Sequence, residues 1–240
     1  MIFSPVSELF ILFFLSTPFW HLLMVSRDAD HSLKQTTVLI TVAMTWCLLA
    51  FGIVKYRIDS FILGTDFPAR PLLYLFLASI IAYKARHWIL GHGVSQHLLI
   101  GLQLIRPIGM VFVLEHTQGN LPGIFAYPAG LGDLLTGVLA AFVLYKFWGT
   151  KIPPFWILLV AGVGLLDFVS AFFFGFTSSE TPVQLFSFEN PNQVTEYPLG
   201  LIPLFLVPYA VIAHILSLTQ LNRDRRTGTI AVQERLEVRN

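Results

Sequence analysis

The sequence predicts an all-α protein in which seven helices cross a membrane as one bundle. Three observations support this class: an apolar composition, seven apolar segments of membrane-spanning length, and an uneven distribution of Lys and Arg between the loops. Of the 240 residues, 55% are hydrophobic and 12% are charged, whereas a soluble domain carries about 25% charged residues. We therefore expect the lipid bilayer to be the main partner of the chain.

The seven apolar segments each fit the roughly 17–25 residues that cross a bilayer as a helix. They cover residues 6–25, 37–54, 71–90, 98–115, 126–147, 154–176 and 199–219. The polar remainder, residues 220–240, is predicted to be a cytoplasmic tail that follows a membrane domain of residues 1–219.

Two of these segments need separate justification. The residues before the first segment, MIFSPVSE, contain no Lys or Arg, and a signal peptide begins with a basic region, so we expect a retained span. The third segment is clearly apolar only over residues 72–83, and Lys84, Arg86 and His87 follow it. These long side chains are expected to reach toward the membrane surface from the end of the helix.

Lys and Arg gather on one side of the predicted bundle. If seven segments cross, 11 of these residues fall on one side and 3 on the other. The larger set is Arg27, Lys34, Lys84, Arg86, Lys146, Lys151, Arg223, Arg225, Arg226, Arg235 and Arg239, and the smaller set is Lys55, Arg57 and Arg70. Because cytoplasmic loops are enriched in Lys and Arg, the bias predicts a cytoplasmic C-terminus and an external N-terminus.

Three ionisable residues, Arg106, Asp133 and Asp167, lie in the middle of apolar segments. Arg106 stands 14 residues before the loop centre near residue 120, and Asp133 stands 13 residues after it. Asp133 and Asp167 stand about 16 and 17 residues from the next loop centre. At a rise of about 1.5 Å per residue, the three side chains are predicted to lie at nearly one depth. Charges at such a depth are rare and are usually paired or functional.

The residues around these charges indicate that they face the interior of the bundle. Ala129 and Gly137 flank Asp133 at four-residue spacing, and small residues at this spacing mark helix faces that pack closely in membranes. Gln103 shares a helix face with Arg106, and Pro107 cannot donate to the carbonyl of Gln103. We therefore add Gln103 to the predicted buried polar site.

The charges of the predicted site do not balance. Arg106 stays protonated, so one carboxylate balances it and the second must share a proton, bind a cation or be protonated. We expect Asp133 to pair with Arg106 across a short hairpin and Asp167 to be the unpaired carboxylate. The alternative interpretation is an ion-pair network that only fixes helix packing. The long acidic loop 177–198 is expected either to cap the outer mouth above Asp167 or to be a surface loop without a role.

A polar path toward the cytoplasm is predicted from His214, Tyr209 and His21. A lone histidine in a helix is more often a structural, hydrogen-bonded group, and Pro203 and Pro208 predict a kink or a hinge beside it. No cofactor is predicted, although a heme held by His21 and His214 is an alternative. No metal site is predicted, because the chain has neither an H-E-x-x-H motif nor two histidines four residues apart on one helix.

These features favour a small transporter or conductance acting on an unknown small ligand or ion. Two other classes stay open: an intramembrane enzyme or cofactor-binding protein for a lipid-soluble ligand, and a structural or assembly subunit. The net charge of +1 argues against nucleic acid as a partner. Cys47 is the only cysteine, which excludes a disulfide within the chain. The oligomeric state stays open.

One stretch of the chain resembles a known kind of family. From Gln103 to Gly137 it contains Arg106, Gly109 and the run Leu-Pro-x-x-Phe-Ala-x-Pro-Ala-Gly-x-Gly-Asp, and later a Pro203-to-His214 pattern followed by Ser-Leu. These residues resemble an uncharacterised family of bacterial multi-pass membrane proteins. The resemblance covers the fourth to seventh predicted helices and implies a bacterial inner membrane, without implying an activity.

Overall fold

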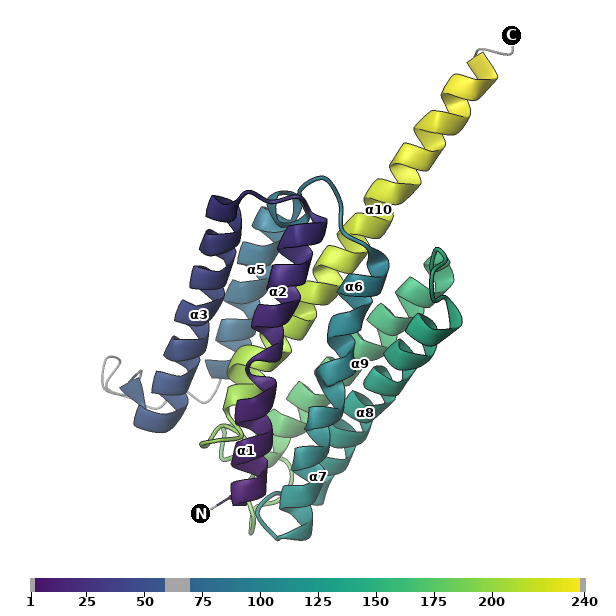
Figure 1. The fold of residues 1–240 in the computed structure, drawn as a ribbon. Helices are drawn as coiled ribbons and strands as arrows, with labels where there is room; N and C mark the ends of the chain where they lie inside the picture. The colour runs from purple at the N-terminus through teal and green to yellow at the C-terminus, as the bar shows by residue number, and fades with distance from the viewer. Residues whose placement is uncertain (1–2, 59–69, 238–240) are drawn as a thin grey trace.

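The computed structural model describes residues 3–58 and 70–237 as a bundle of helices that run between two ends (Figure 1). No strand occurs within these described ranges, so the predicted all-α class is confirmed. The helices are α1 (Pro5–Phe14), α2 (Thr17–Asp28), α3 (Leu33–Tyr56), α5 (Arg70–Leu90), α6 (Gln96–Gly101), η1 (Leu102–Gly109), α7 (Met110–Thr117), α8 (Gly123–Lys146), α9 (Pro154–Ser178), η2 (Ile202–Leu206) and α10 (Val207–Glu237).

The connecting loops lie at the two ends of the bundle. One end, which we call the N-terminal end, holds the start of α1, the α7–α8 loop and the loop of residues 179–201 (Figure 1). The opposite end, the C-terminal end, holds the α2–α3, α5–α6 and α8–α9 connections, and α10 projects beyond it. Each long helical segment therefore runs the full length of the bundle.

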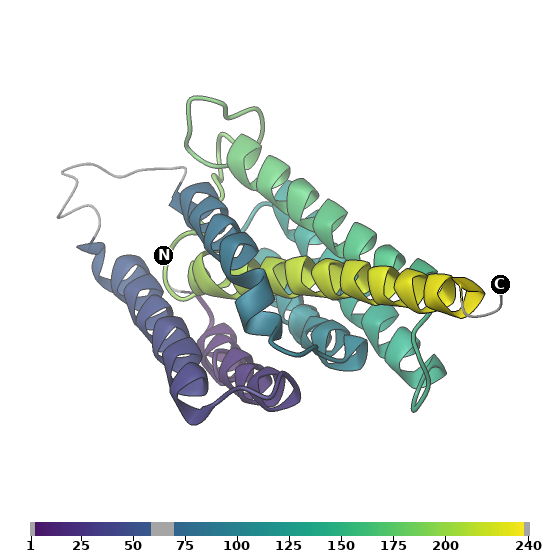
Figure 2. The same ribbon diagram turned by 90° about the horizontal axis from the view of Figure 1, so that it is seen from above.

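Helix α10 lies inside the bundle for its first half and joins the other helices together. It packs against α5, α6 and α9, while α8 packs against α9, η1 and α7. Figure 2 shows α10 between the group of α3 and α5 and the group of α8 and α9. Helix α10 therefore contacts helices on both of its sides and occupies a central position in the bundle.

Six helical segments are long and apolar enough to cross a membrane: Pro5–Asp28, Leu33–Tyr56, Gln96–Thr117, Gly123–Lys146, Pro154–Ser178 and Ile202–Thr227. This finding fits an integral membrane protein. The third predicted segment is also a helix, α5, but Lys84 and Arg86 near its end make it less apolar than the six. The fifth predicted segment begins at Gly123 rather than at 126, and Pro128 lies inside the helix.

Three of the predicted spans are interrupted, the first, the fourth and the last. The first breaks between α1 and α2, beside Pro18. Pro18 has no N–H for the carbonyl of Phe14 four residues before it, and the hydroxyl of Thr17 donates to that carbonyl at 2.7 Å. The fourth span changes to a 3₁₀-helix over Leu102–Gly109, where Pro107 likewise removes a donor.

The last span is interrupted as well. It starts as a π-helix over Ile202–Leu206 before the α-helical α10. Pro208 cannot donate to the carbonyl of Leu204, and the indole nitrogen of Trp46 on α3 donates to it at 3.1 Å instead. A carbonyl freed inside a membrane needs such a partner, so this bond joins α3 to the irregular part of the last span.

The polar tail begins as a continuation of the last helix. Helix α10 extends through Glu237, well beyond the expected end of the span at residue 219. The side chain of Gln220 accepts from the backbone of Val94 at 3.3 Å, and Arg223 donates to the carbonyl of Gly91 at 3.0 Å. The first turn after the predicted span is therefore tied to the α5–α6 loop.

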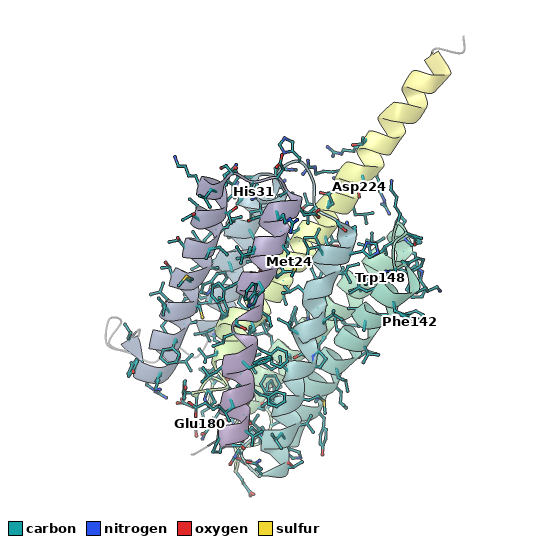
Figure 3. All side chains as sticks on the ribbon, viewed as in Figure 1. Met24, His31, Phe142, Trp148, Glu180 and Asp224 are labelled. Atoms are coloured by element: carbon teal, nitrogen blue, oxygen red, sulfur yellow. The ribbon has the colours of Figure 1, made fainter. Side chains whose placement is uncertain are left out.

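The exterior of the bundle is apolar between its two ends. Met24 and Phe142 are exposed large apolar side chains on its flanks, while Glu180 and Asp224 lie toward opposite ends (Figure 3). An apolar exterior of this extent is unusual for a soluble monomer and is suited to contact with lipid.

Candidate functional site

Arg106 joins Asp133 and Asp167 in one buried cluster. Its Nε donates a hydrogen bond to Oδ1 of Asp133 on α8, and its Nη2 donates to Oδ2 of Asp167 on α9. The Arg106 side chain is only 3% exposed, and both carboxylates are buried. We call these three residues the triad. The expected pairing of Arg106 with Asp133 alone was wrong, because a guanidinium carries donors on several nitrogens and here binds both carboxylates.

An aromatic ring supports the guanidinium from one side. The central carbon of the Arg106 guanidinium lies 3.8 Å from the centre of the Phe168 ring, a distance at which a cation is attracted to the aromatic face. The same ring contacts His214 on α10 in a T-shaped arrangement, with 6.4 Å between ring centres. Phe168 thus links the triad to the last span.

Three ionisable side chains of the site each lie against a glycine of a neighbouring helix. The side chain of Asp133 lies against Gly109, that of Asp167 against Gly132, and that of His214 against Gly164. A β-carbon built at any of these glycines would collide with the side chain that covers it. The glycines therefore allow the polar groups to lie close to the next backbone, which small residues make possible in membrane bundles.

The triad and its neighbours contain polar atoms without a partner. Among the described residues, Nη1 of Arg106, Oδ1 of Asp167, Oε1 of Gln103 and Nε2 of His214 are buried and make no hydrogen bond. Gln103 uses its other end to donate to the carbonyl of Ala210 at 3.3 Å. Native proteins pair nearly all buried polar groups, so a cluster of unpaired atoms points to a missing ligand, proton or water.

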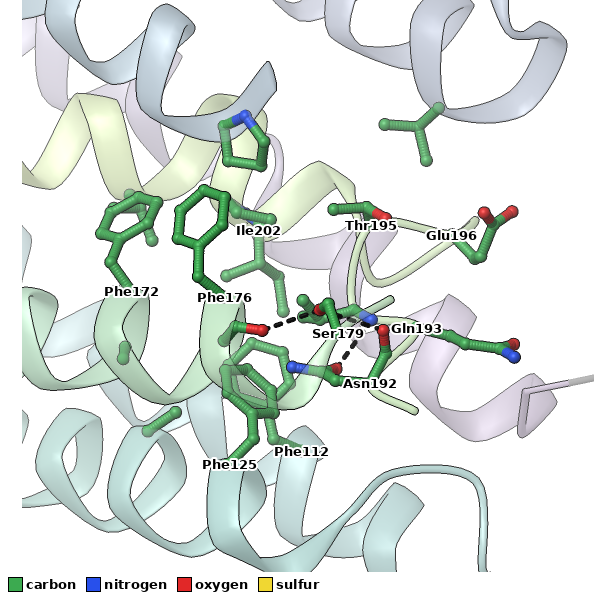
Figure 4. Close-up of a pocket in the computed structure, with 18 of the residues that line it drawn as sticks. Phe112, Phe125, Phe172, Phe176, Ser179, Asn192, Gln193, Thr195, Glu196 and Ile202 are labelled. Atoms are coloured by element: carbon green, nitrogen blue, oxygen red, sulfur yellow. Dashed lines mark hydrogen bonds between the residues drawn. The ribbon is translucent and has the colours of Figure 1, made fainter. Parts of the chain in front are cut away.

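A cavity of about 780 Å³ leads from the N-terminal end of the bundle to the two carboxylates. We call it the chamber; it is lined at its base by Asp133 and Asp167 and along its walls by Phe112, Phe125, Phe168, Phe172 and Phe176. Figure 4 shows four of these rings together with loop residues from Ser179 to Glu196. Its volume is in the range of small-molecule sites.

The 179–201 loop forms the mouth of the chamber. Glu180, Asn192 and Glu196 from this loop line the chamber together with Lys55 in the last turn of α3 and Arg57 directly after it. Arg57 forms an ion pair with Glu196, and the ammonium of Lys55 lies 4.7 Å from the centre of the Tyr197 ring. The loop was expected either to cap the outer mouth above Asp167 or to be a surface loop without a role, and the geometry matches the cap.

The loop is also tied to α1. The hydroxyl of Tyr197 donates to Oε1 of Glu8 at 2.6 Å. Partial burial and this carboxylate raise the pKa of Tyr197 to about 12, so its proton stays in place at ordinary pH. The contacts of Tyr197 and Glu196 hold the end of the loop against the first and third helices.

The predicted inward path is divided into two separate parts. His21 shares a hydrogen bond of 3.1 Å with the hydroxyl of Tyr209, and its other ring nitrogen lies 2.8 Å from the carbonyl of Leu98. His214 instead lies beside Phe168 and Gly164. Both ring nitrogens of His21 are occupied, so this residue does not fit as a heme ligand. No group of three or more potential metal-binding side chains occurs within residues 3–58 and 70–237.

Sequence reasoning missed one buried carboxylate, Glu115 near the end of α7. It accepts hydrogen bonds from the backbone of Ser4 at 3.0 Å, from the hydroxyl of Ser7, and from the amide of Asn120 at 2.7 Å. The residue stands at the edge of an apolar segment, where a solvated carboxylate is the ordinary interpretation. Two of its partners are more than 100 residues away in the chain, which no local pattern indicates.

Residues 70–222 match a protein family described as a domain of unknown function, DUF8737. The chain belongs to this family. The matched region runs from α5 into α10 and contains the triad, Gln103, Tyr209 and His214. The match agrees with the expectation of an uncharacterised family and begins one helix earlier than the resemblance did. No curated protein and no solved structure matched the chain.

Replacing Gly132 tests the fit between α8 and α9. Gly132→Ala places a methyl group where Asp167 now lies, so either the carboxylate or the helix must move. We expect a loss of about 1–3 kcal/mol in unfolding free energy, as is typical of overpacking, measured by denaturation of the purified protein in detergent. The control is Gly162→Ala, where a β-carbon meets nothing within 4 Å and a gain of about 0.5–1 kcal/mol is expected.

Removing the guanidinium tests the ion-pair network itself. Arg106→Ala leaves two buried carboxylates without their donor, and we expect a loss of about 3–5 kcal/mol in the same unfolding measurement. The combined change Arg106→Met, Asp133→Asn and Asp167→Asn removes all three charges and is expected to be more stable than Arg106→Ala. Equal stability of the two variants would contradict a charge network and indicate simple loss of packing.

Proposed function

We propose that the protein is a seven-span integral membrane protein of a bacterial inner membrane that moves a small solute or ion through the chamber. The triad acts as the site at which the transported species or a coupled proton is held. One observation carries this proposal: the chamber reaches from the 179–201 loop to the carboxylates of Asp133 and Asp167. A packing network alone requires no such access.

The seventh span in this proposal is α5. It runs between the same two ends as its neighbours (Figure 1), it packs along α10, and its Lys84 and Arg86 stand near the C-terminal end of the bundle. That end also carries the larger set of Lys and Arg residues, so it is assigned to the cytoplasm. Within the two charge sets, Arg239 lies outside the described residues, as do the side chains of Arg70 and Arg235.

The charge of the triad supports coupling to a cation. The guanidinium of Arg106 bridges both carboxylates, so one negative charge remains when both are ionised. A net charge at this depth is costly, and a proton or a cation arriving through the chamber removes it. A bound proton and a bound cation are then alternatives at one site, so the arrival of the cation releases the proton, which is the basis of exchange.

Irregular helices around the triad support movement of the spans. Arg106 itself belongs to the 3₁₀-helix η1, the last span starts with the π-helix η2, and the first span is broken between α1 and α2. Such π-helical segments are frequent at functional sites, and hinges occur where helices are interrupted. The chamber is open toward the loops of the N-terminal end, so the proposed movement closes that end and opens the opposite one.

The orientation is tested by reporter fusions. A reporter fused after Asn240 is expected to be active in the cytoplasm, and one inserted in the 179–201 loop is expected to be active outside. A third reporter in the α2–α3 loop tests α5, because with a cytoplasmic C-terminus this loop is cytoplasmic only if α5 crosses the membrane. An external signal from that third fusion would remove α5 from the set of spans.

Transport is tested with single amide substitutions. Asp133→Asn and Asp167→Asn keep the shape of each side chain and remove one of two negative charges, so both proteins are expected to fold. We expect each to lose most solute-dependent or ion-dependent flux in reconstituted vesicles, by about ten-fold or more, because the cluster no longer carries an exchangeable charge. Leu166→Ala, on the exposed face of α9 and apolar before and after the change, is the control on the same helix. Folded variants with unchanged flux would assign the triad to packing alone.

A further inference from the structure

We infer that the chamber is a binding site for a small monovalent organic cation, an ammonium group attached to an apolar body. The ammonium group lies at the base beside Asp133 and Asp167, and the apolar body lies between the phenylalanine rings. This inference deepens the proposed function, because it names the chemical class of the species that the chamber accepts. It rests on the base, the walls and the mouth of the chamber.

The base supplies an unsatisfied negative site. Asp133 and Asp167 both line the chamber and are only 6% and 7% exposed. The guanidinium of Arg106 donates to both carboxylates, so its single positive charge balances only one of their two negative charges. An ammonium group at the base donates hydrogen bonds to these carboxylates and neutralises the remaining charge.

The walls favour a cation that is not hydrated. Five phenylalanine rings line the chamber, and aromatic faces attract quaternary and primary ammonium groups while excluding water. The guanidinium of Arg106 on the face of Phe168 is an internal example of this contact. A bare divalent metal ion instead requires about six oxygen ligands, and no cluster of three suitable side chains occurs in the described ranges.

The mouth does not repel a cation. Lys55 and Arg57 line it, but so do Glu180 and Glu196, and Arg57 is paired with Glu196. The two signs balance there, whereas at the base two carboxylates face one guanidinium. An anion therefore meets no net attraction at the mouth and repulsion at the base, while a cation meets attraction only at the base.

Binding to the purified full chain in lipid nanodiscs tests the inference. The probes are phenylbutylammonium, phenylbutanol and phenylbutyrate, which share one apolar body and carry a positive, neutral or negative group. Isothermal titration is expected to give an affinity for the ammonium compound about ten-fold or more above that for the alcohol, since a hydrogen bond between charged groups is stronger than a neutral one. No binding of the carboxylate is expected.

Variants assign this preference to the chamber. Asp167→Asn is expected to remove the ten-fold preference for the ammonium compound and to leave binding of the alcohol. Phe176 lies nine residues along α9 from Asp167 and lines the wall above the base, so Phe176→Leu is expected to weaken binding of the ammonium compound and of the alcohol alike and to leave their ratio unchanged. The control is Phe173→Leu on the same helix, at a side chain that is 54% exposed and does not line the chamber. The affinities of the Phe173→Leu protein for the ammonium compound and the alcohol are expected to equal those of the unmodified protein.

The outcomes separate this inference from the proposed transport. Equal affinity for the three probes, or an ammonium preference that survives Asp167→Asn, overturns the organic-cation site. Loss of flux in the amide variants without any ammonium preference leaves the transport proposal standing and removes this inference. An ammonium preference that depends on Asp167, with binding of both compounds weakened by Phe176→Leu, in a protein without flux in vesicles, establishes the site and removes transport.

Discussion

The guanidinium of Arg106 between the carboxylates of Asp133 and Asp167 is the interaction on which the rest of the structure depends. It joins η1, α8 and α9 at one point, and the packing of these helices follows from it. A buried charge of either sign is stable only with its partners in place. The cluster therefore fixes the relative depth and rotation of three spans, and it leaves one charge that the protein cannot balance by itself.

The glycines and prolines around the triad follow from the same requirement. Gly109 and Gly132 give space to the two carboxylates, and Gly137 gives space to the ring of Pro107. The prolines interrupt the spans and free carbonyls, which side chains such as Trp46 then satisfy. Close helix packing and an irregular helix thus occur together at the triad, where Arg106 belongs to the 3₁₀-helix η1.

The chamber is built from two parts of the chain, one inside and one outside the region that matches the family. Its base and walls come from α7 to α10, inside the region shared with the family. Part of its mouth comes from the end of α3, through Lys55 and Arg57, which lie outside that region. The 179–201 loop connects the two parts, since it contacts Arg57 with Glu196 and α1 with Tyr197. The family region thus supplies the proposed chemistry, and the first helices help to close the entrance.

The sequence by itself determined the class of fold and the identity of the triad, because hydrophobic length and rare mid-helix charges are local properties. Only the tertiary structure decided how the charges are shared, since a guanidinium reaches two carboxylates only when both helices present them together. It also decided the break beside Pro18, the burial of Glu115 and the shape of the chamber. These features depend on contacts between residues far apart in the chain, such as Glu115 with Ser4, and no periodic pattern encodes them.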